Sequence, residues 1–81
     1  MMRNKLLKIK MFGIVAEKTG TGNLTIPFVD DTDKLYLLLL EKHPQLDGIK
    51  FAIAVNRQIV HQNTSLAQND EIALLPPFSG G

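Results

Sequence analysis

The chain has 81 residues, contains no cysteine and carries a formal net charge of +1 at pH 7. This length allows one small domain with one core, and the lack of cysteine excludes disulfides, thiolate metal sites and a cysteine nucleophile. The near-neutral charge with dispersed lysines argues against a nucleic-acid partner, and the longest apolar run, Leu35 to Leu40, is too short to cross a membrane, so we expect a cytoplasmic protein.

The first strand is predicted over residues 5–12, where apolar and polar residues alternate. Leu7, Ile9 and Met11 would face the core, which places Phe12 on the solvated face of the sheet.

The next segment, residues 13–18, is expected to continue the strand less regularly. Residues 19–23 are rich in glycine and threonine, which is typical of a turn, and a second strand is predicted over residues 24–28.

A helix is predicted to begin in the cluster of short oxygen-bearing side chains at residues 30–33 and to end at about His43, before Pro44. This acidic cluster could bind a magnesium ion, but helix capping explains the same residues without a ligand. The helix positions expected to face the core are Leu35, Leu38 and Leu39. Leu37 and Leu40 widen its apolar surface, and the sequence leaves open whether they are partly exposed or contact a partner.

Three more strands are predicted in the second half of the chain, over residues 51–55, 58–61 and 71–75. Asn56-Arg57 is expected to form the turn between the first two. The positions predicted to face the core are Phe51, Ile53, Val55, Val60, Ile72 and Leu74. The positions predicted to face outward are Ala52, Ala54, Ile59, Ala73 and Leu75.

The predicted element order is β-β-α-β-β-β, with one main helix covering one face of a mixed sheet. This order indicates an α+β roll of the ubiquitin-like, or β-grasp, kind. We expect residues 1–75 to form the domain and residues 76–81 to form an extended C-terminal tail.

Three large apolar side chains are predicted on the face that the helix leaves open: Phe12, Ile59 and Leu75. Small alanines lie among them. Apolar residues gathered on one face beside the base of a tail predict a docking surface for a partner, although a covering loop would also explain them.

The tail has a sequence suited to entering another protein. Pro76 and Pro77 end the last strand, because proline cannot donate to a sheet ladder, and they favour a stiff extended chain. Phe78 and Ser79 follow, with Phe78 as the expected anchor in a partner's groove. Gly80 and Gly81 carry no side chain and therefore fit a narrow channel. The extended tail would reach about 20 Å, and its reactive group is the α-carboxylate of Gly81.

No self-contained active site is expected. The two histidines, His43 and His61, lie on different predicted elements, and no acid stands at ligand spacing from either. A zinc site or a histidine-based triad is therefore not predicted, and no metal ligands are assigned.

Two segments carry a family resemblance: Ala54-Val55-Asn56, and residues 69–81, which end in Pro-Pro-Phe-Ser-Gly-Gly. Together with the opening strand and the His43-Pro44 helix end, they resemble the small, sulfur-carrying subunits of molybdopterin synthase. Ubiquitin-like sulfur carriers share the terminal diglycine. The proline pair favours the molybdopterin branch over the carriers of the thiamine pathway.

The resemblance implies that Gly81 is the reacting residue and that sulfur is carried covalently as its thiocarboxylate. An E1-like activating enzyme would use ATP and magnesium to adenylate the carboxylate, and a persulfide donor would supply the sulfur. The large catalytic subunit would then take the sulfur to convert cyclic pyranopterin monophosphate to molybdopterin, within a heterotetrameric synthase. By the same resemblance, Phe12, Ile59 and Leu75 match the apolar docking positions of the family.

One departure from the family is Ala16, which stands where many members carry an arginine, so an ion pair from this position is in doubt. Three alternatives stay open from the sequence: a carrier for thiamine or another thio-compound, a ubiquitin-like modifier joined to lysines, and an interaction domain with an idle tail. The chain alone is not expected to turn over a substrate.

Overall fold

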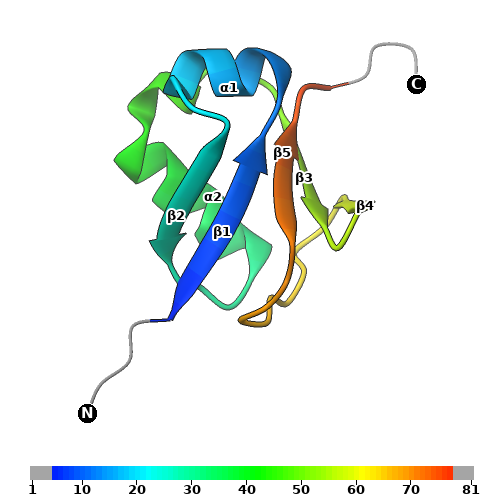
Figure 1. Cartoon of the computed structure of the whole chain (residues 1–81). Coiled ribbons are helices and arrows are strands. Elements are labelled where there is room, and N and C mark those ends of the chain that lie inside the picture. The colour runs from blue at the N-terminus through cyan, green and yellow to red at the C-terminus, as the bar shows by residue number, and fades with distance from the viewer. Residues whose placement is uncertain (1–4, 78–81) are drawn as a thin grey trace.

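The computed structural model describes residues 5–77 and contains one mixed sheet of five strands in the order β2-β1-β5-β3-β4 (Figure 1). The strands are β1 (Leu6–Met11), β2 (Asn23–Pro27), β3 (Ala52–Val55), β4 (Gln58–Val60) and β5 (Ile72–Leu75). The central pair, β1 and β5, is parallel, and the other pairs are antiparallel. This topology confirms the predicted β-grasp roll.

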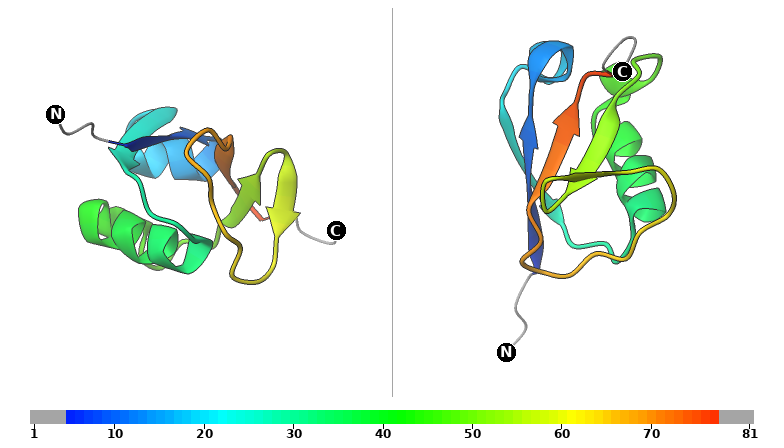
Figure 2. Two further views of the ribbon diagram at one scale, coloured as in Figure 1. Left: turned by 90° about the horizontal axis from the view of Figure 1, so that it is seen from below. Right: turned by 90° about the vertical axis from the view of Figure 1, so that its right-hand side faces the viewer.

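Helix α2 (Thr32–Lys42) lies across one face of the sheet and leaves the other face open (Figure 2). Its start is capped as predicted, because the Asp31 carboxylate accepts a hydrogen bond from the Lys34 backbone N–H at 2.8 Å. Asn63, from the loop before β5, accepts a second one from the Asp33 N–H at 2.9 Å. After the helix, Pro44 begins a short 3₁₀ helix, η1 (Pro44–Leu46).

The prediction that residues 13–18 continue the first strand is wrong, because they form helix α1 (Gly13–Thr19). Gly13 has φ +59°, which turns the chain out of the extended conformation of β1. Gly20, at φ +78°, ends the helix in the left-handed conformation, and its N–H bonds to the Ala16 carbonyl at 2.9 Å. The helix buries Val15 completely.

The core lies between α2 and the sheet, and the alternation in the sequence identified most of it. Leu35 and Leu39 are fully buried on α2, whereas Leu38 is partly buried. Leu46 of η1 adds a fully buried side chain that the sequence did not predict. The core residues that the strands contribute are Leu7, Ile9, Met11, Ile26, Val55, Ile72 and Leu74.

The turn between β3 and β4 forms at Asn56-Arg57, as predicted. Both residues have positive φ, 52° and 72°, which matches the twist that a two-residue hairpin needs. The Asn56 side chain also accepts a hydrogen bond from the Glu71 N–H at 2.9 Å and donates one to Asp70 at 3.0 Å. The hairpin is thereby joined to the start of β5.

Asp70 holds the loop that enters β5. Its carboxylate accepts hydrogen bonds from the Ala67 N–H at 2.7 Å and from the Asn56 amide at 3.0 Å. Both bonds favour the ionised form, the one from Ala67 most strongly, and they lower the pKa of Asp70 below its ordinary value.

Asp70→Asn is expected to reduce the acid sensitivity of the fold. Because the pKa is lower in the folded than in the unfolded chain, the carboxylate stabilises the fold above about pH 4, and this contribution is lost as the pH falls through the folded pKa. Urea unfolding at neutral pH and at about pH 3 should show a smaller loss for the variant than for the wild type. Asp47→Asn, at an exposed position after η1, is the control and should keep the wild-type loss.

Candidate docking face

The open face of the sheet presents one residue in two from each strand, and the strand register fixes which of them are neighbours. Ala54 pairs with Ile59 across β3–β4 and with Ala73 across β3–β5. Two residues further along β5, Leu75 pairs with Ala52. These residues share a face because directly paired residues point to the same side of a sheet.

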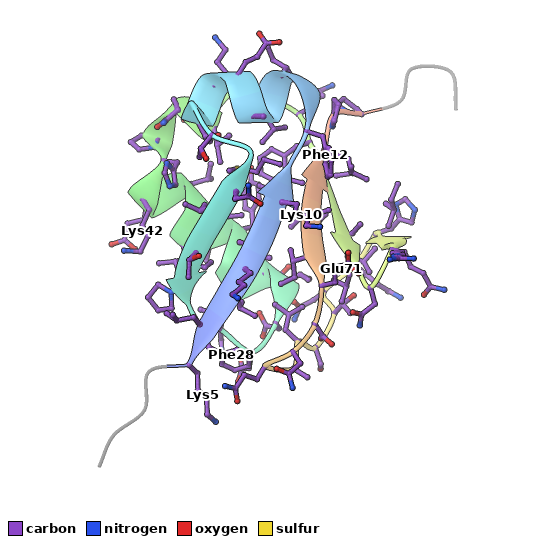
Figure 3. All side chains as sticks on the ribbon, viewed as in Figure 1. Lys5, Lys10, Phe12, Phe28, Lys42 and Glu71 are labelled. Carbon is purple, nitrogen blue, oxygen red and sulfur yellow. The ribbon has the colours of Figure 1, made fainter. Side chains whose placement is uncertain are left out.

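Phe12 completes this group at the end of β1. Its N–H donates to the Leu74 carbonyl at 3.1 Å, which extends the parallel pairing and places Phe12 beside Leu75. Figure 3 shows Phe12, Lys10 and Glu71 on the open side of β1 and β5. We call the apolar group the docking face: Phe12, Ala52, Ala54, Ile59, Ala73 and Leu75.

The three large residues of the docking face lie where the sequence placed them. Phe12 is 48% exposed, Ile59 is 38% exposed and Leu75 is half-buried. Ala54, predicted to be exposed, is buried instead, because its short side chain lies between Ile59 and Ala73 on the same face. The docking face therefore consists of small alanine side chains with the larger Phe12, Ile59 and Leu75 around them.

Charged residues border the apolar group on the open face. Lys8 and Lys10 precede Phe12 on β1, and Glu71 precedes β5. Arg57 in the hairpin turn lies with its Nε 3.5 Å from Glu71 Oε1, and both side chains are largely exposed. An exposed pair of this kind contributes little to stability. On the open face, Lys10 lies level with Ala73, so charged residues border the apolar group on its β1 side as well as away from Pro76.

The tail begins directly at the apolar end. Pro76 is partly buried and Pro77 is exposed, and both follow Leu75 without a break. The remaining predicted tail residues, Phe78, Ser79, Gly80 and Gly81, lie outside the described residues.

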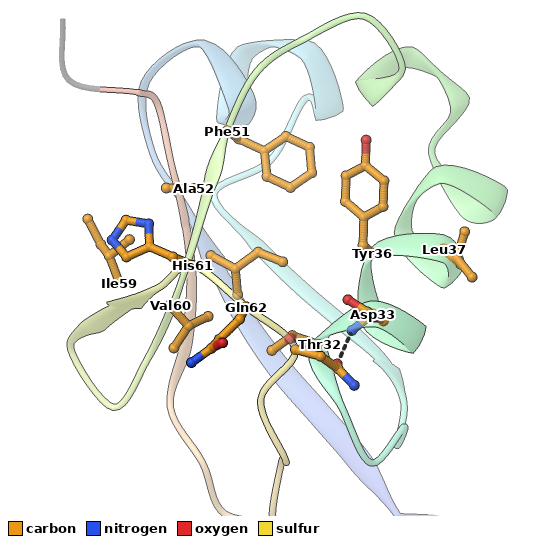
Figure 4. Close-up of a pocket in the computed structure, with 12 residues that line it drawn as sticks. Thr32, Asp33, Tyr36, Leu37, Phe51, Ala52, Ile59, Val60, His61 and Gln62 are labelled. Atoms are coloured by element: carbon orange, nitrogen blue, oxygen red, sulfur yellow. Dashed lines mark hydrogen bonds between the residues drawn. The ribbon is translucent and has the colours of Figure 1, made fainter.

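Around the edge of the sheet at β4, a groove of about 660 Å³ separates α2 from β3 and β4 (Figure 4). Tyr36 and Phe51 face each other across it, with ring centroids 5.7 Å apart. Ala52 and Ile59 belong both to the docking face and to this groove. The sequence did not predict the groove, because it forms only when distant segments pack.

The structure also locates Leu37 and Leu40, which the sequence left open. Leu37 is 65% exposed at the rim of the groove, whereas Leu40 is partly buried and packs against the core. Leu37 is thus a free apolar side chain on the opposite side of the sheet from the docking face.

The histidines lie apart, His43 at the end of α2 and His61 in the groove after β4. Within residues 5–77, no group of three or more acidic or histidine side chains is placed to hold a metal ion. No helix in the same range is long and apolar enough to cross a membrane. In the described part of the chain, the features that stand out are therefore the apolar group on the open face and the two prolines that follow Leu75.

Comparison with known proteins agrees with this geometry. Curated proteins named molybdopterin synthase sulfur carrier subunit include one from Dictyostelium discoideum, 33% identical with 91% of this chain and 94% of the relative covered. Another, from Arabidopsis thaliana, is 30% identical, with 93% of this chain and 82% of the relative covered.

Solved structures are also similar to this chain. A complex of subunits 1 and 2 of molybdopterin-converting factor from Helicobacter pylori 26695 contains a chain 32% identical to this one, with a TM-score of 0.68 over 94% of this chain and 99% of that one. Small archaeal modifier protein 1 from Haloferax volcanii is 26% identical, with a TM-score of 0.73 and the same coverage. The ThiS family profile matches residues 9–81, and the chain therefore belongs to the ThiS family.

Proposed function

We propose that this protein is the sulfur carrier subunit of molybdopterin synthase, and that it carries sulfur as a thiocarboxylate on Gly81. The observation that carries the proposal is the match over nine-tenths of the chain to curated relatives with this name. The docking face supports it, because the face ends where the diglycine tail begins.

The chemistry of the tail follows from the reactivity of a carboxylate. The Gly81 carboxylate is anionic at neutral pH and therefore a poor electrophile. An E1-like enzyme would join it to the α-phosphorus of ATP, with magnesium, and release pyrophosphate. A persulfide sulfur then displaces AMP from the acyl carbon, and cleavage of the resulting acyl disulfide by a thiol leaves the thiocarboxylate. The thiocarboxylate sulfur is the nucleophile that is passed on to the pterin substrate.

The partner is the large catalytic subunit, which would bind the docking face and receive the tail. Phe12, Ile59 and Leu75 are already more than half-buried, so burying the rest of each would contribute about 0.5–1.5 kcal/mol. Association itself costs an estimated 4–15 kcal/mol. The face alone would therefore give a weak complex, and the tail, with Phe78 as an anchor, must supply further contacts. We place this complex, a heterotetramer, in the cytoplasm.

A second function has a specific observation in its favour. The fold and 26% of the residues match a protein named as an archaeal modifier, so Gly81 is a candidate for amide linkage to lysines of target proteins. Chymotrypsin cleaves after phenylalanine, so digestion after Phe78 would leave a branched Ser-Gly-Gly on the target lysine, whereas trypsin would leave residues 58–81 because Arg57 is the last arginine or lysine. Finding such conjugates in cells would add the modifier function, and their absence would leave the carrier function alone.

The test of the main proposal is the intact mass of the protein purified from sulfur-replete cells that contain its activating enzyme. A fraction should be heavier by the difference between one sulfur and one oxygen atom, and fragmentation should place that change on Gly81. If only the free carboxylate is found, even after incubation with ATP, the activating enzyme and a persulfide donor, the carrier proposal fails.

A further inference from the structure

The turn from β1 into α1 is built against the first residue of the tail. A Cβ atom placed on Gly13 would lie 2.9 Å from Cγ of Pro76, 3.5 Å from its Cδ and 3.7 Å from its Cβ. Carbon atoms do not approach to 2.9 Å without displacement of one of them. The proline ring therefore rests on the bare backbone of Gly13.

Both sides of this contact are fixed by the sheet. On one side, the Phe12 N–H donates a hydrogen bond to the Leu74 carbonyl at 3.1 Å, so the residue before Gly13 is held against the end of strand β5. On the other side, Leu74 is fully buried and proline has a locked φ, so Pro76 has little freedom. Figure 1 shows the end of β5 passing beside the start of α1.

We infer that Gly13 is a positioning residue, which fixes the direction in which the tail leaves the domain relative to the docking face. The inference rests on the proposed function, because it gives that direction a purpose. Five residues follow Pro76, and an extended chain of this length spans about 17 Å, so a small tilt at Pro76 displaces the reacting end by several ångströms. Reactions between held groups lose about a hundredfold in rate for a misplacement of about 1 Å.

A simpler role for Gly13 is to supply positive φ at a turn, and Gly20 separates the two roles. Gly20 also has positive φ, +78°, and stands at the other end of the same helix, but a Cβ placed there meets no atom within 4 Å. Asparagine tolerates the left-handed conformation better than most residues. Gly13→Asn and Gly20→Asn therefore make similar backbone demands, and only the first displaces Pro76.

The experiment measures sulfur transfer in the complex of the full-length thiocarboxylated carrier with its large subunit, at varied carrier concentration. For Gly13→Asn we expect kcat to fall by about a hundredfold with KM within about twofold of wild type, because the docking face is retained. Gly20→Asn should keep both constants. Adding Pro76→Ala to Gly13→Asn removes the ring atom that clashes and should restore most of the lost kcat relative to the single variant.

Nuclear Overhauser contacts give a second readout that does not depend on activity. The wild type should show contacts between the Gly13 Hα protons and the Pro76 ring, and Gly13→Asn should lose them while Gly20→Asn keeps them. If Gly13→Asn does not fold, Gly13→Asp replaces it with Gly20→Asp as its control, because aspartate also tolerates the left-handed conformation and carries the same Cβ.

Equal kcat values for all variants, or equal losses in Gly13→Asn and Gly20→Asn, would overturn the positioning role. Absence of these contacts in the wild type would also overturn it. If the wild type and Gly20→Asn transfer no sulfur at all, the proposed function fails, and the Overhauser contacts still decide whether Gly13 seats the tail.

Discussion

Deletion of Gly81 is expected to abolish sulfur transfer while leaving the free energy of unfolding unchanged. The new terminal carboxylate, on Gly80, would stop about 3.5 Å short of the position that the activating enzyme and the large subunit reach. Such a displacement should lower the rate of thiocarboxylate formation by a hundredfold or more. The buried core residues lie between Leu7 and Leu74, so the fold does not depend on the last residue.

Mass spectrometry of the thiocarboxylate and thermal unfolding of the same samples measure the two effects. Adding one alanine after Gly81 moves the carboxylate in the other direction and should be equally inactive. Ser79→Ala leaves both the length and the terminal carboxylate unchanged and is the control, expected to retain at least about half of the activity. A truncated protein that still becomes thiocarboxylated at a normal rate would show that the terminal position is not what the enzymes recognise.

The faces of the sheet were predictable from the sequence because only one of them is covered by α2. A strand with one buried face alternates strictly, and Leu7, Ile9 and Met11 follow that pattern, as do Ile72 and Leu74. The alternation stops at Gly13, and there the prediction failed. One buried residue, Val15, marks the core face of the short α1, which is too little periodicity to identify a helix.

The apolar group on the open face was likewise predictable, since the open face is the complement of the core face in the same strands. The parallel pairing of β1 with β5, which brings Phe12 beside Leu75, joins the two ends of the chain and has no local sequence signal. The contact of Gly13 with Pro76 depends on that pairing. The only sequence feature that hinted at this contact was a glycine directly after the first strand. A glycine at that position is compatible with many kinds of turn.

Replacing Leu75 with glutamate is expected to weaken binding of the large subunit far more than it weakens the fold. Leu75 is half-buried in the free domain and would be buried in the complex, so the change removes about 0.5–1 kcal/mol of apolar burial on binding and adds the larger cost of desolvating a charge. The dissociation constant should rise by about a hundredfold, which corresponds to about 2.7 kcal/mol. The free energy of unfolding should change by about 1 kcal/mol or less, because Leu75 faces away from the core.

Leu37→Glu is the matched control, because it introduces the same charge at an apolar residue on the other side of the sheet. Leu37 is 65% exposed on α2, so the change should leave both stability and binding close to wild type. Calorimetric titration with the large subunit separates the two positions. Equal weakening by both variants would show that added negative charge, rather than the docking face, controls the affinity. Wild-type binding by Leu75→Glu, with a large loss of thermal stability, would show instead that the open face is structural and that the partner binds elsewhere.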